Sequence, residues 1–430
     1  MRIAVVGTGI AGMVAARLAQ REHEVTVFEA SDWVGGHAHT VDVANVDGPL
    51  AVDTGFLVHN RPGYPELTRL FDELGVATQE SDMSFSVRCE RTGLEYNGTS
   101  LNSLFAQRRN LFRPSFHRMI RDILRFYREA PALAERSDPG PTLGEYLEVG
   151  GYSTAFIEHH ALPMGAAIWS APSRGLRDFP AKYFVRFFQQ HGFLQVNDRP
   201  CWRTVTGGSR EYVRLLTASY RDRIRLSCPV ERITRFDDRV EVWTRDGGAE
   251  SFDHAVLALH SDQALRLLAD PSPTERELLS AIPYQENDVV LHHDTSLLPR
   301  RPLARASWNV HLIDPDAARV AVTYDVSRLQ RLRGPERYLV TLNHADAIRD
   351  DRVLRRFTYH HPVYTAAGFA AQERHAEISG VNRTHYCGAY WGYGFHEDGV
   401  VSALRAWERF EETTRREELS LSGMGPASAA

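Results

Sequence analysis

The sequence predicts an α/β fold built on a parallel β-sheet, and its first 29 residues carry the prediction. Residues 2–6 form a short apolar run rich in β-branched side chains, which is typical of a strand buried on both faces. A glycine-rich turn follows at residues 7–12, and Ile10, Val14 and Leu18 then recur at helical spacing. Residues 24–29 form a second strand pattern, which completes a βαβ unit with a right-handed crossover.

Composition and charge narrow the class of protein. A hydrophobic fraction of 43% and a charged fraction of 24% are typical of a globular chain. The formal net charge of −5 predicts no broad positive field, so the composition implies neither nucleic acid nor an anionic lipid surface as a partner. The four cysteines are too sparse for a disulfide framework and lack metal-ligand spacing, which fits a reducing cytoplasm.

The apolar segments do not predict insertion into a membrane. Glycines interrupt the apolar run at the N-terminus, which therefore does not resemble a signal peptide. No apolar stretch approaches the roughly 18 residues that a membrane span requires. We expect a cytoplasmic protein and leave a peripheral association with the membrane open.

The glycine-rich turn has the spacing of a dinucleotide-binding motif. Gly7, Gly9 and Gly12 form G-x-G-x-x-G directly after a strand and at the start of a helix. The first glycine permits the tight turn, the second lets the backbone approach a pyrophosphate, and the third allows close packing of helix on strand. Glu29 closes the second strand, where a carboxylate would accept the hydroxyls of an adenosine ribose and repel a 2′-phosphate.

The residues after Glu29 distinguish FAD from NAD. Two segments carry this distinction: the run Glu29-Ala30-Ser31-Asp32-Trp33-Val34-Gly35-Gly36-His37 and the later Asp53-Thr54-Gly55-Phe56. With them, residues 5–40 and their continuation resemble the FAD fingerprint of the flavin amine oxidase superfamily. The resemblance implies that the Gly-Gly segment runs beside the pyrophosphate of FAD. His37 stands where relatives commonly carry Arg or Lys, and a neutral imidazole would bind phosphate less strongly.

Two further segments resemble FAD-binding elements of the same superfamily. Val230 matches a strand residue whose backbone meets the adenine, and residues 387–400 match the junction that brings a helix N-terminus to the flavin ring. The bland alternatives are an ordinary strand and an ordinary loop. Taken together, the predicted FAD contacts are Gly7, Gly9, Ile10, Ala11, Gly12, Glu29, Ala30, Gly35, Gly36, His37, Thr54, Gly55, Phe56, Val230, Gly392, Asp398, Gly399 and Val400.

The catalytic residues are less defined, because a flavin accepts hydride without a protein nucleophile. The candidates are Tyr390, Trp391, Tyr393 and His396, which precede or begin the last helix and could line the substrate side of the flavin. His396 and Glu397 could exchange protons near the ring or simply cap a helix. His292, His293 and Asp294 adjoin one another, but neighbours on a strand point to opposite faces, so we expect no metal site.

A length of 430 residues favours two domains. We expect a discontinuous Rossmann-like FAD-binding domain at residues 1–75, 200–285 and 375–415, and an inserted α+β substrate domain at 76–199 and 286–374.

The pattern predicts a helix over 62–76, helices between 101 and 188, and strands at 224–226, 239–244 and 254–259, with residues 246–248 joining the last two as a hairpin. Further strands are expected at 288–293, 319–324, 337–342 and 384–387, a final helix over 399–416 and a disordered tail over 416–430.

We infer the substrate class from the absence of a lysine at one position and from a resemblance to a group of bacterial flavoproteins. Many amine oxidases of the superfamily place a lysine beside the flavin, whereas Lys182 is the only lysine of this chain and the corresponding strand is taken to be Val289-Val290-Leu291-His292-His293-Asp294. Residues 259–265, 291–294, 307–309 and 388–399 resemble bacterial flavoproteins similar to the N-terminal extension of plant cyclopropane-fatty-acid synthases. That resemblance implies a fatty-acyl or other lipid substrate and a functional link to a methyltransferase of that kind.

We therefore expect a FAD-dependent oxidoreductase that abstracts hydride from a lipid, by desaturation or a related oxidation. The alternatives are an amine or amino-acid oxidase, a redox-neutral flavin isomerase or mutase, and a catalytically silent FAD-binding partner of a lipid methyltransferase. The electron acceptor stays open between oxygen, a quinone and a redox protein, because the sequence holds no second nucleotide motif.

Overall fold

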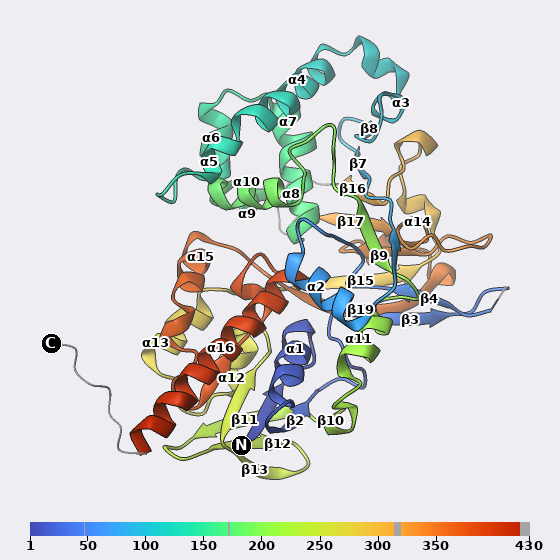
Figure 1. The fold of residues 1–430 in the computed structure, drawn as a ribbon. Helices are drawn as coiled ribbons and strands as arrows, with labels where there is room; N and C mark the ends of the chain where they lie inside the picture. The colour runs from blue at the N-terminus through green and yellow to red at the C-terminus, as the bar shows by residue number, and fades with distance from the viewer. Residues whose placement is uncertain (47, 171–172, 314–319, 422–430) are drawn as a thin grey trace.

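A computed structural model describes residues 1–46, 48–170, 173–313 and 320–421. Its first layer is a five-stranded parallel sheet in the order β10-β2-β1-β14-β20, which confirms the α/β class (Figure 1). The strands are β1 (Arg2–Val6), β2 (Glu24–Phe28), β10 (Ile224–Arg225), β14 (His254–Leu257) and β20 (Thr384–Tyr386).

Both faces of this sheet are covered, which explains its continuous apolar strands. Ile3 and Val5 pack into a core shared with α1 (Ile10–Ala19) and α16 (His396–Leu421). Ala4 and Val6 point the other way, into a second core beneath β11 (Val230–Arg235), β12 (Val240–Thr244) and β13 (Gly248–Phe252). Because successive side chains of a strand alternate between faces, β1 needs an apolar residue at every position.

The predicted hairpin is wrong in one respect. The turn at residues 246–248 joins β12 to β13, an antiparallel strand that the sequence pattern did not reveal. The next strand, β14, instead pairs in parallel with β1. The sequence of β13, Gly-Ala-Glu-Ser-Phe, has only one large apolar residue, and four of its five positions are not buried, so it carries little of the hydrophobic signal that reveals a strand.

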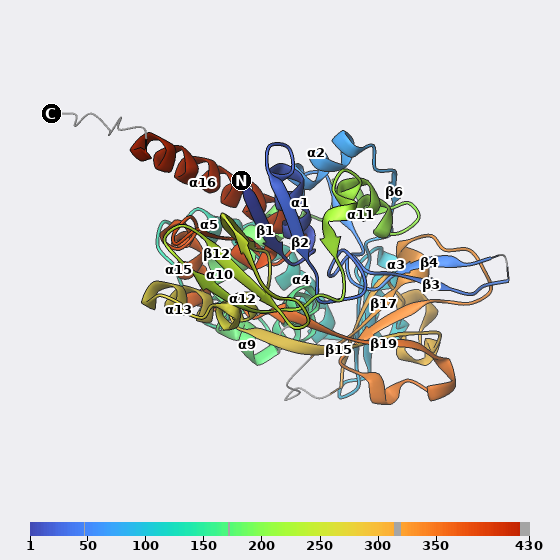
Figure 2. The ribbon, with the colours of Figure 1, turned by 90° about the horizontal axis from the view of Figure 1, so that it is seen from below.

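The substrate-domain sheet has seven strands in the order β19-β15-β18-β17-β16-β7-β8. All neighbours are antiparallel except β16 and β7. The predicted strands correspond to β15 (Tyr284–His292), β17 (Ala321–Asp325) and β18 (Leu339–Leu342), whereas β7 (Phe85–Cys89), β8 (Leu94–Asn97), β16 (Trp308–Leu312) and β19 (Val353–Pro362) were not predicted. In Figure 2, β15 and β19 run side by side as the longest pair of this sheet.

Helices between residues 101 and 190 form the rest of the inserted part, as the aromatic periodicity predicts. They are α3 (Leu101–Leu104), α4 (Pro114–Glu129), α5 (Pro131–Ala134), α6 (Leu143–Val149), α7 (Thr154–Phe156), α8 (Leu162–Trp169), α9 (Ser173–Arg177) and α10 (Ala181–Gln190). Their interior is filled mainly by phenylalanines, among them Phe126, Phe156 and Phe184. Figure 1 shows this helical layer at the end of the molecule opposite the N-terminus.

Shorter elements complete the fold, and some of them form two small further sheets, β3-β4 and β5-β9-β6. The shorter elements are β3 (Thr40–Val43), β4 (Leu50–Asp53), β5 (His59–Asn60), β6 (Thr78–Glu80), β9 (Trp202–Val205), α2 (Pro65–Leu74), α11 (Arg210–Thr217), α12 (Ser261–Leu267), α13 (Pro273–Ser280), α14 (Val326–Leu329) and α15 (Ala366–Glu373). The helix α2 ends at Gly75, which adopts a left-handed conformation as the C-terminal stop predicts. The last helix, α16, begins at His396 and continues to Leu421, past the expected end at 416, and the remaining tail lies outside the described residues.

Candidate active site

The glycine motif lies where the fold requires it, between β1 and α1. Gly7 has a φ of +101°, and a Cβ there would overlap the carbonyl oxygen of Ala258. A Cβ at Gly12 would overlap the carbonyl oxygen of Gly7. Gly9 differs, because the position of its missing Cβ has no atom within 4 Å. Gly7 and Gly12 therefore permit the tight turn and the close packing of α1, and Gly9 leaves the backbone accessible to a ligand.

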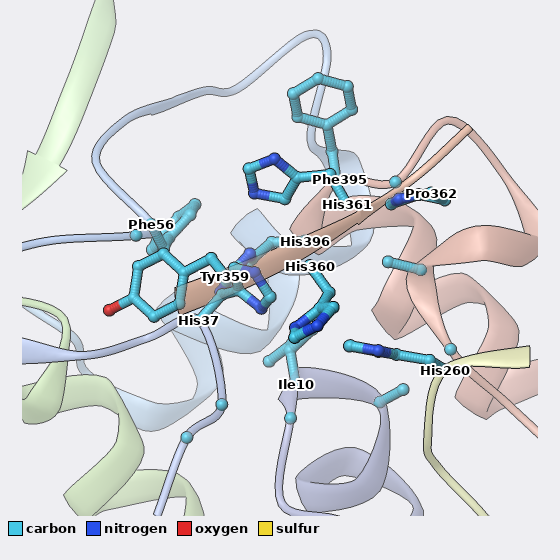
Figure 3. Close-up of a pocket in the computed structure, with 18 of the residues that line it drawn as sticks. Ile10, His37, Phe56, His260, Tyr359, His360, His361, Pro362, Phe395 and His396 are labelled. Carbon is cyan, nitrogen blue, oxygen red and sulfur yellow. The ribbon is translucent and has the colours of Figure 1, made fainter. Parts of the chain in front are cut away.

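Gly9 faces a cavity of about 950 Å³ at the carboxyl ends of β1, β2 and β14. This edge is where ligands bind in open α/β sheets, and the volume suits a ligand as large as a dinucleotide. The wall opposite the glycine turn is β19 of the substrate domain, as Figure 3 shows. Predicted FAD contacts that line the cavity are Gly7, Gly9, Ile10, Ala11, Glu29, Ala30, Gly35, Gly36, His37, Thr54, Gly55, Phe56 and Val230.

Glu29 binds the turn as well as lining the cavity. Its Oε2 accepts hydrogen bonds from the backbone N–H of Thr8 at 2.9 Å and from Thr8 Oγ1 at 2.5 Å. Its Oε1 accepts the N–H of Ser31 at 2.8 Å. A carboxylate offers about four acceptor positions, so Glu29 retains acceptor capacity for a ribose hydroxyl while holding the glycine turn against the end of β2.

The Gly-Gly segment packs directly on the glycine turn. A Cβ at Gly36, where φ is +58°, would lie 3.2 Å from the Cα of Gly9. His37 follows, with its ring centroid 5.0 Å from that of Tyr359 and 5.4 Å from that of His361. The Nε2 of His37 is buried and has no hydrogen-bond partner among the described residues. Burial, helped by the nearby His360 and His39, lowers the pKa of His37 to about 4.

Further imidazoles on other elements surround His37, and the sequence analysis did not single them out. His260 lies just before α12, stacks on Tyr284 at 4.1 Å, and approaches His360 to 5.9 Å between ring centroids. Burial lowers the pKa of His260 and of His361 to about 3. His37, His260 and His361 are therefore neutral at pH 7. The adjacent pair His360-His361 could have been noticed in the sequence, but nothing local indicates that β19 crosses the cofactor domain.

Gly392, Asp398 and Gly399 pack against the start of α1 or against one another, and they do not line the cavity. A Cβ at Gly399 would lie 2.5 Å from Cγ2 of Ile10, so a glycine lets α16 approach the start of α1. A Cβ at Gly392 would overlap the carboxylate of Asp398, whose Oδ2 accepts the N–H of Phe395 at 2.9 Å. Burial raises the pKa of Asp398 to about 7. The predicted contacts that do not line the cavity are Gly12, Gly392, Asp398, Gly399 and Val400.

The four catalytic candidates separate into two pairs. Tyr393 and His396 line the cavity, whereas Tyr390 and Trp391 lie in the core beneath the parallel sheet. The 3₁₀ turn at residues 389–391 directs the latter two rings inward, and Trp391 packs at 4.6 Å on His375. This position does not suit a residue that touches substrate.

His396 and Glu397 have different surroundings. His396 stacks on Phe56 at 3.7 Å, and its Nε2 lies 2.9 Å from the hydroxyl of Tyr212. Burial lowers the pKa of His396 to about 3. Glu397 accepts the backbone N–H groups of Glu66 and Leu67, both at 2.9 Å, and so caps the start of α2. Of the two roles considered for this acid, the geometry favours the cap.

The strand considered for the amine-oxidase lysine does not face the cavity. Residues 289–294 are absent from the cavity wall, and His292 is buried against Thr341, with 2.7 Å between Nε2 and Oγ1. Lys182 is also elsewhere, with Nζ donating to the carbonyl of Asp138 at 3.3 Å. Within the described ranges, no group of three or more His, Cys, Asp and Glu residues could hold a metal ion.

The fold and the site together define a dinucleotide-binding α/β protein in which a second domain forms part of the cavity wall. The open space at Gly9 and the unpartnered Nε2 of His37 fit a bound diphosphate, and the cavity continues past Phe56 toward the substrate domain.

Comparison with known proteins identifies the family. Residues 10–293 match the family model of flavin-containing amine oxidoreductases, and the chain belongs to that family. It is 27% identical over 340 residues to the flavin-containing monoamine oxidase AofH of Mycobacterium tuberculosis, covering 76% of this chain and 70% of that protein. The chain is therefore a FAD-dependent oxidoreductase.

Two solved structures share the fold at low sequence identity. Cyclohexylamine oxidase from Brevibacterium oxydans IH-35A superposes with a TM-score of 0.69 at 16% identity, covering 96% of this chain and 99% of that chain. The fatty acid isomerase of P. acnes that produces CLA superposes with a TM-score of 0.66 at 18% identity, covering 95% and 98%. The same fold is therefore found in a protein named as an amine oxidase and in one named as a fatty acid isomerase.

Proposed function

We propose that this flavoenzyme oxidises a lipid-like substrate with a fatty-acyl chain. FAD, when bound, accepts hydride at N5, so the protein must bind the chain, orient the carbon that loses hydride and exclude water. The observation that supports the proposal is the composition of the cavity wall beyond Phe56. The apolar and aromatic side chains of that wall are Met83, Ile168, Trp169, Phe187, Phe193, Trp202, Trp308, Tyr324, Leu342, Tyr364, Tyr393 and Phe395, and they outnumber the polar Ser170 and His191 beside them.

The same wall offers little to a cationic amine. Among the described residues that line the cavity, Glu29 is the only carboxylate, and it is held against Thr8 and Ser31 at the nucleotide end. An ammonium group buried without a counter-ion loses much of its hydration energy, which cation–π contacts with the aromatic rings would recover only in part. An apolar chain gains about 0.8 kcal/mol for each buried CH₂ group instead.

A small number of polar atoms in this apolar wall could orient a substrate. The hydroxyl of Tyr364 and Nε1 of Trp308 are buried and have no hydrogen-bond partner among the residues described. Both residues line the cavity. Each can donate a hydrogen bond to an oxygen of the substrate, and a buried donor left without a partner costs about 1–3 kcal/mol.

Anaerobic reduction of the bound flavin tests the proposal. The purified protein is mixed with unsaturated or methyl-branched acyl lipids in one series and with primary amines and amino acids in the other. We expect the acyl lipids to bleach the flavin and the amines not to. Rapid bleaching by amines alone would refute the lipid proposal and support the amine alternative.

Two other outcomes separate the remaining alternatives. Conversion of the lipid by photoreduced enzyme without net consumption of electrons would support an isomerase or mutase. Retention of FAD without bleaching by any lipid, together with copurification of a lipid methyltransferase, would support a silent partner of that enzyme. In both cases the proposed oxidation would be excluded.

A further inference from the structure

A strongly basic corner of the substrate domain contrasts with the net negative charge of the chain. Residues 96–121 contain five arginines and no Asp or Glu, and residues 295–313 contain three arginines and no Asp or Glu. The structure brings these two acid-free segments together, because α3 and β8 contact the 3₁₀ helix Pro302–Ala304. Figure 1 places α3 and β8 at the end of the molecule opposite the N-terminus.

Large apolar side chains project from the same corner. Phe112 is 86% exposed and Leu101 is 76% exposed, and Leu111 and Leu303 are each nearly half exposed. Phe112 and Leu111 end the 3₁₀ helix Arg108–Phe112, whose last turn is held by His117 donating from Nε2 to the carbonyl of Leu111 at 2.8 Å. Exposed apolar side chains flanked by basic ones mark a surface that binds a partner with an apolar interior and an acidic surface.

The corner also contains a second cavity, of about 550 Å³. Arginines form most of its charged wall, namely Arg88, Arg108, Arg109, Arg300 and Arg301, with Glu90 and Glu95 as the acids. Glu95 is 5% exposed and accepts the backbone N–H groups of Arg300 at 3.0 Å and Arg301 at 2.9 Å, which fixes the loop that carries them.

The acids of this cavity do not neutralise all of its arginines. Glu90 pairs with Arg88 and Arg300. Arg109 donates only to the carbonyl of Gly93, at 2.7 Å, and the side chain of Arg301 makes no hydrogen bond or ion pair with any described residue. Guanidinium groups without a carboxylate partner are suited to phosphate, which they can bind through two parallel hydrogen bonds.

We propose that this corner docks the enzyme on an anionic lipid bilayer, with Phe112 and Leu111 entering the headgroup region and the arginine-lined cavity taking a headgroup phosphate. The negative net charge of the chain does not prevent this docking. Salt screens electrostatic interactions over about a Debye length, which is smaller than the diameter of the protein, so the bilayer interacts mainly with the charges of the nearest surface. Within the described ranges no helix is long and apolar enough to cross a membrane, and the docking needs none. The proposal concerns the surface alone and does not depend on the substrate.

Vesicle flotation tests the docking without turnover. The FAD-loaded protein is mixed with vesicles of phosphatidylcholine alone or of phosphatidylcholine with phosphatidylglycerol, at low and high salt. We expect flotation with the anionic vesicles only, weakened by salt. Phe112→Asp should reduce the binding constant by about tenfold or more, because it removes the apolar side chain that enters the headgroup region and adds a negative charge. Arg109→Gln and Arg301→Gln should each reduce it by about fivefold.

Matched variants control for general effects of surface mutation. Val149, 91% exposed at the end of α6, supplies Val149→Asp, and Arg69 of α2, whose side chain is 66% exposed, supplies Arg69→Gln. Both should bind vesicles like the unmodified protein, and all variants should keep the flavin spectrum and melting temperature. Equal flotation with neutral vesicles, equal loss in the controls, or binding to acidic polypeptides or nucleic acid but not to vesicles would each overturn the proposal. Failure of acyl lipids to bleach the flavin would leave this result unaffected.

Discussion

The hydroxyl of Tyr359 lies 2.7 Å from Oγ1 of Thr54 and 2.9 Å from Nδ1 of His39. Tyr359 belongs to β19 of the substrate-domain sheet, whereas Thr54 follows β4 and lines the nucleotide cavity. These hydrogen bonds therefore join the substrate-domain sheet to the chain that flanks the β3-β4 pair, at the point where the cofactor and the substrate are expected to meet. Burial raises the pKa of Tyr359 to about 12, so the hydroxyl stays protonated and can donate across the whole physiological range.

A double-mutant cycle measures this connection. Tyr359→Phe removes the hydroxyl and should lower the free energy of unfolding by about 1 kcal/mol, the usual net value of a buried hydrogen bond. Thr54→Val should lower it by a similar amount, and the double variant should lose clearly less than the sum of the two. Urea denaturation of the four proteins gives the values. Strict additivity would show that the two residues do not stabilise each other.

The glycine turn predicts a contrast between two substitutions by the same residue. Gly9→Ala places its methyl group in open space, so the melting temperature should remain close to that of the unmodified protein while FAD affinity falls at least tenfold. Gly12→Ala forces the methyl group into the carbonyl of Gly7, so the fold itself should be destabilised. Thermal melts of the apoprotein, paired with FAD titration, separate the effects. A large drop in the melting temperature of Gly9→Ala would contradict the assignment of that space to a ligand.

The imidazoles around His37 predict that FAD affinity depends on pH. Burial holds the pKa of His37 at about 4, and a bound diphosphate anion would raise it by favouring the charged ring. Binding therefore takes up protons, and the dissociation constant should fall as pH is lowered from about 8 toward 6, by at most tenfold per pH unit for each proton. The groups that face His37 are His39, Tyr359, His360, His361, His260 and His396.

The substitution His37→Arg tests which group causes the pH dependence of FAD affinity. His37→Arg carries a permanent charge, so it should bind FAD more tightly than the unmodified protein at pH 8 and show a flatter pH profile. His117→Arg is the matched control, because His117 is exposed on α4, away from the cavity. Flavin fluorescence quenching at several pH values gives both curves. A profile for His37→Arg as steep as that of the control would place the titrating group elsewhere.

The two roles considered for Glu397 can be separated by measuring stability and flavin reduction on the same variant. Glu397→Ala removes a cap that accepts two backbone N–H groups of α2, so we expect a loss of about 1–2 kcal/mol in the free energy of unfolding. Flavin reduction by dithionite and its pH dependence should not change, because the carboxylate is directed at α2. A shifted pH profile with unchanged stability would instead indicate proton exchange with the flavin.

Several features were predictable because the physics that produces them is local. The G-x-G-x-x-G turn, the apolar strand before it and Glu29 after the next strand depend on backbone conformation and close approach within about 30 residues. The same holds for the Gly-Gly segment, in which Gly36 meets Gly9. The errors are also local in origin: β13 is weakly apolar, and β19 carries arginines and histidines that conceal a strand pattern.

The side chains that face the substrate could not be predicted in this way. Tyr390 and Tyr393 are three residues apart, yet one is buried in a core and the other lines the cavity, because the 3₁₀ turn between them rotates the chain. The imidazoles of β19 reach His37 only through pairing of β19 with β15 across the second sheet. Likewise, a net charge of −5 hides a basic corner that forms when two acid-free segments meet.

The amino-acid sequence by itself determined the α/β class, the nucleotide motif and most of the backbone that would cradle FAD, since glycine spacing and strand periodicity act over short distances along the chain. Only the tertiary structure decided which aromatic and histidine side chains surround the cavity, and where positive charge gathers on the surface. Those properties depend on contacts between segments hundreds of residues apart, whose pairing is determined by the packing of the whole chain and not by any single stretch of it.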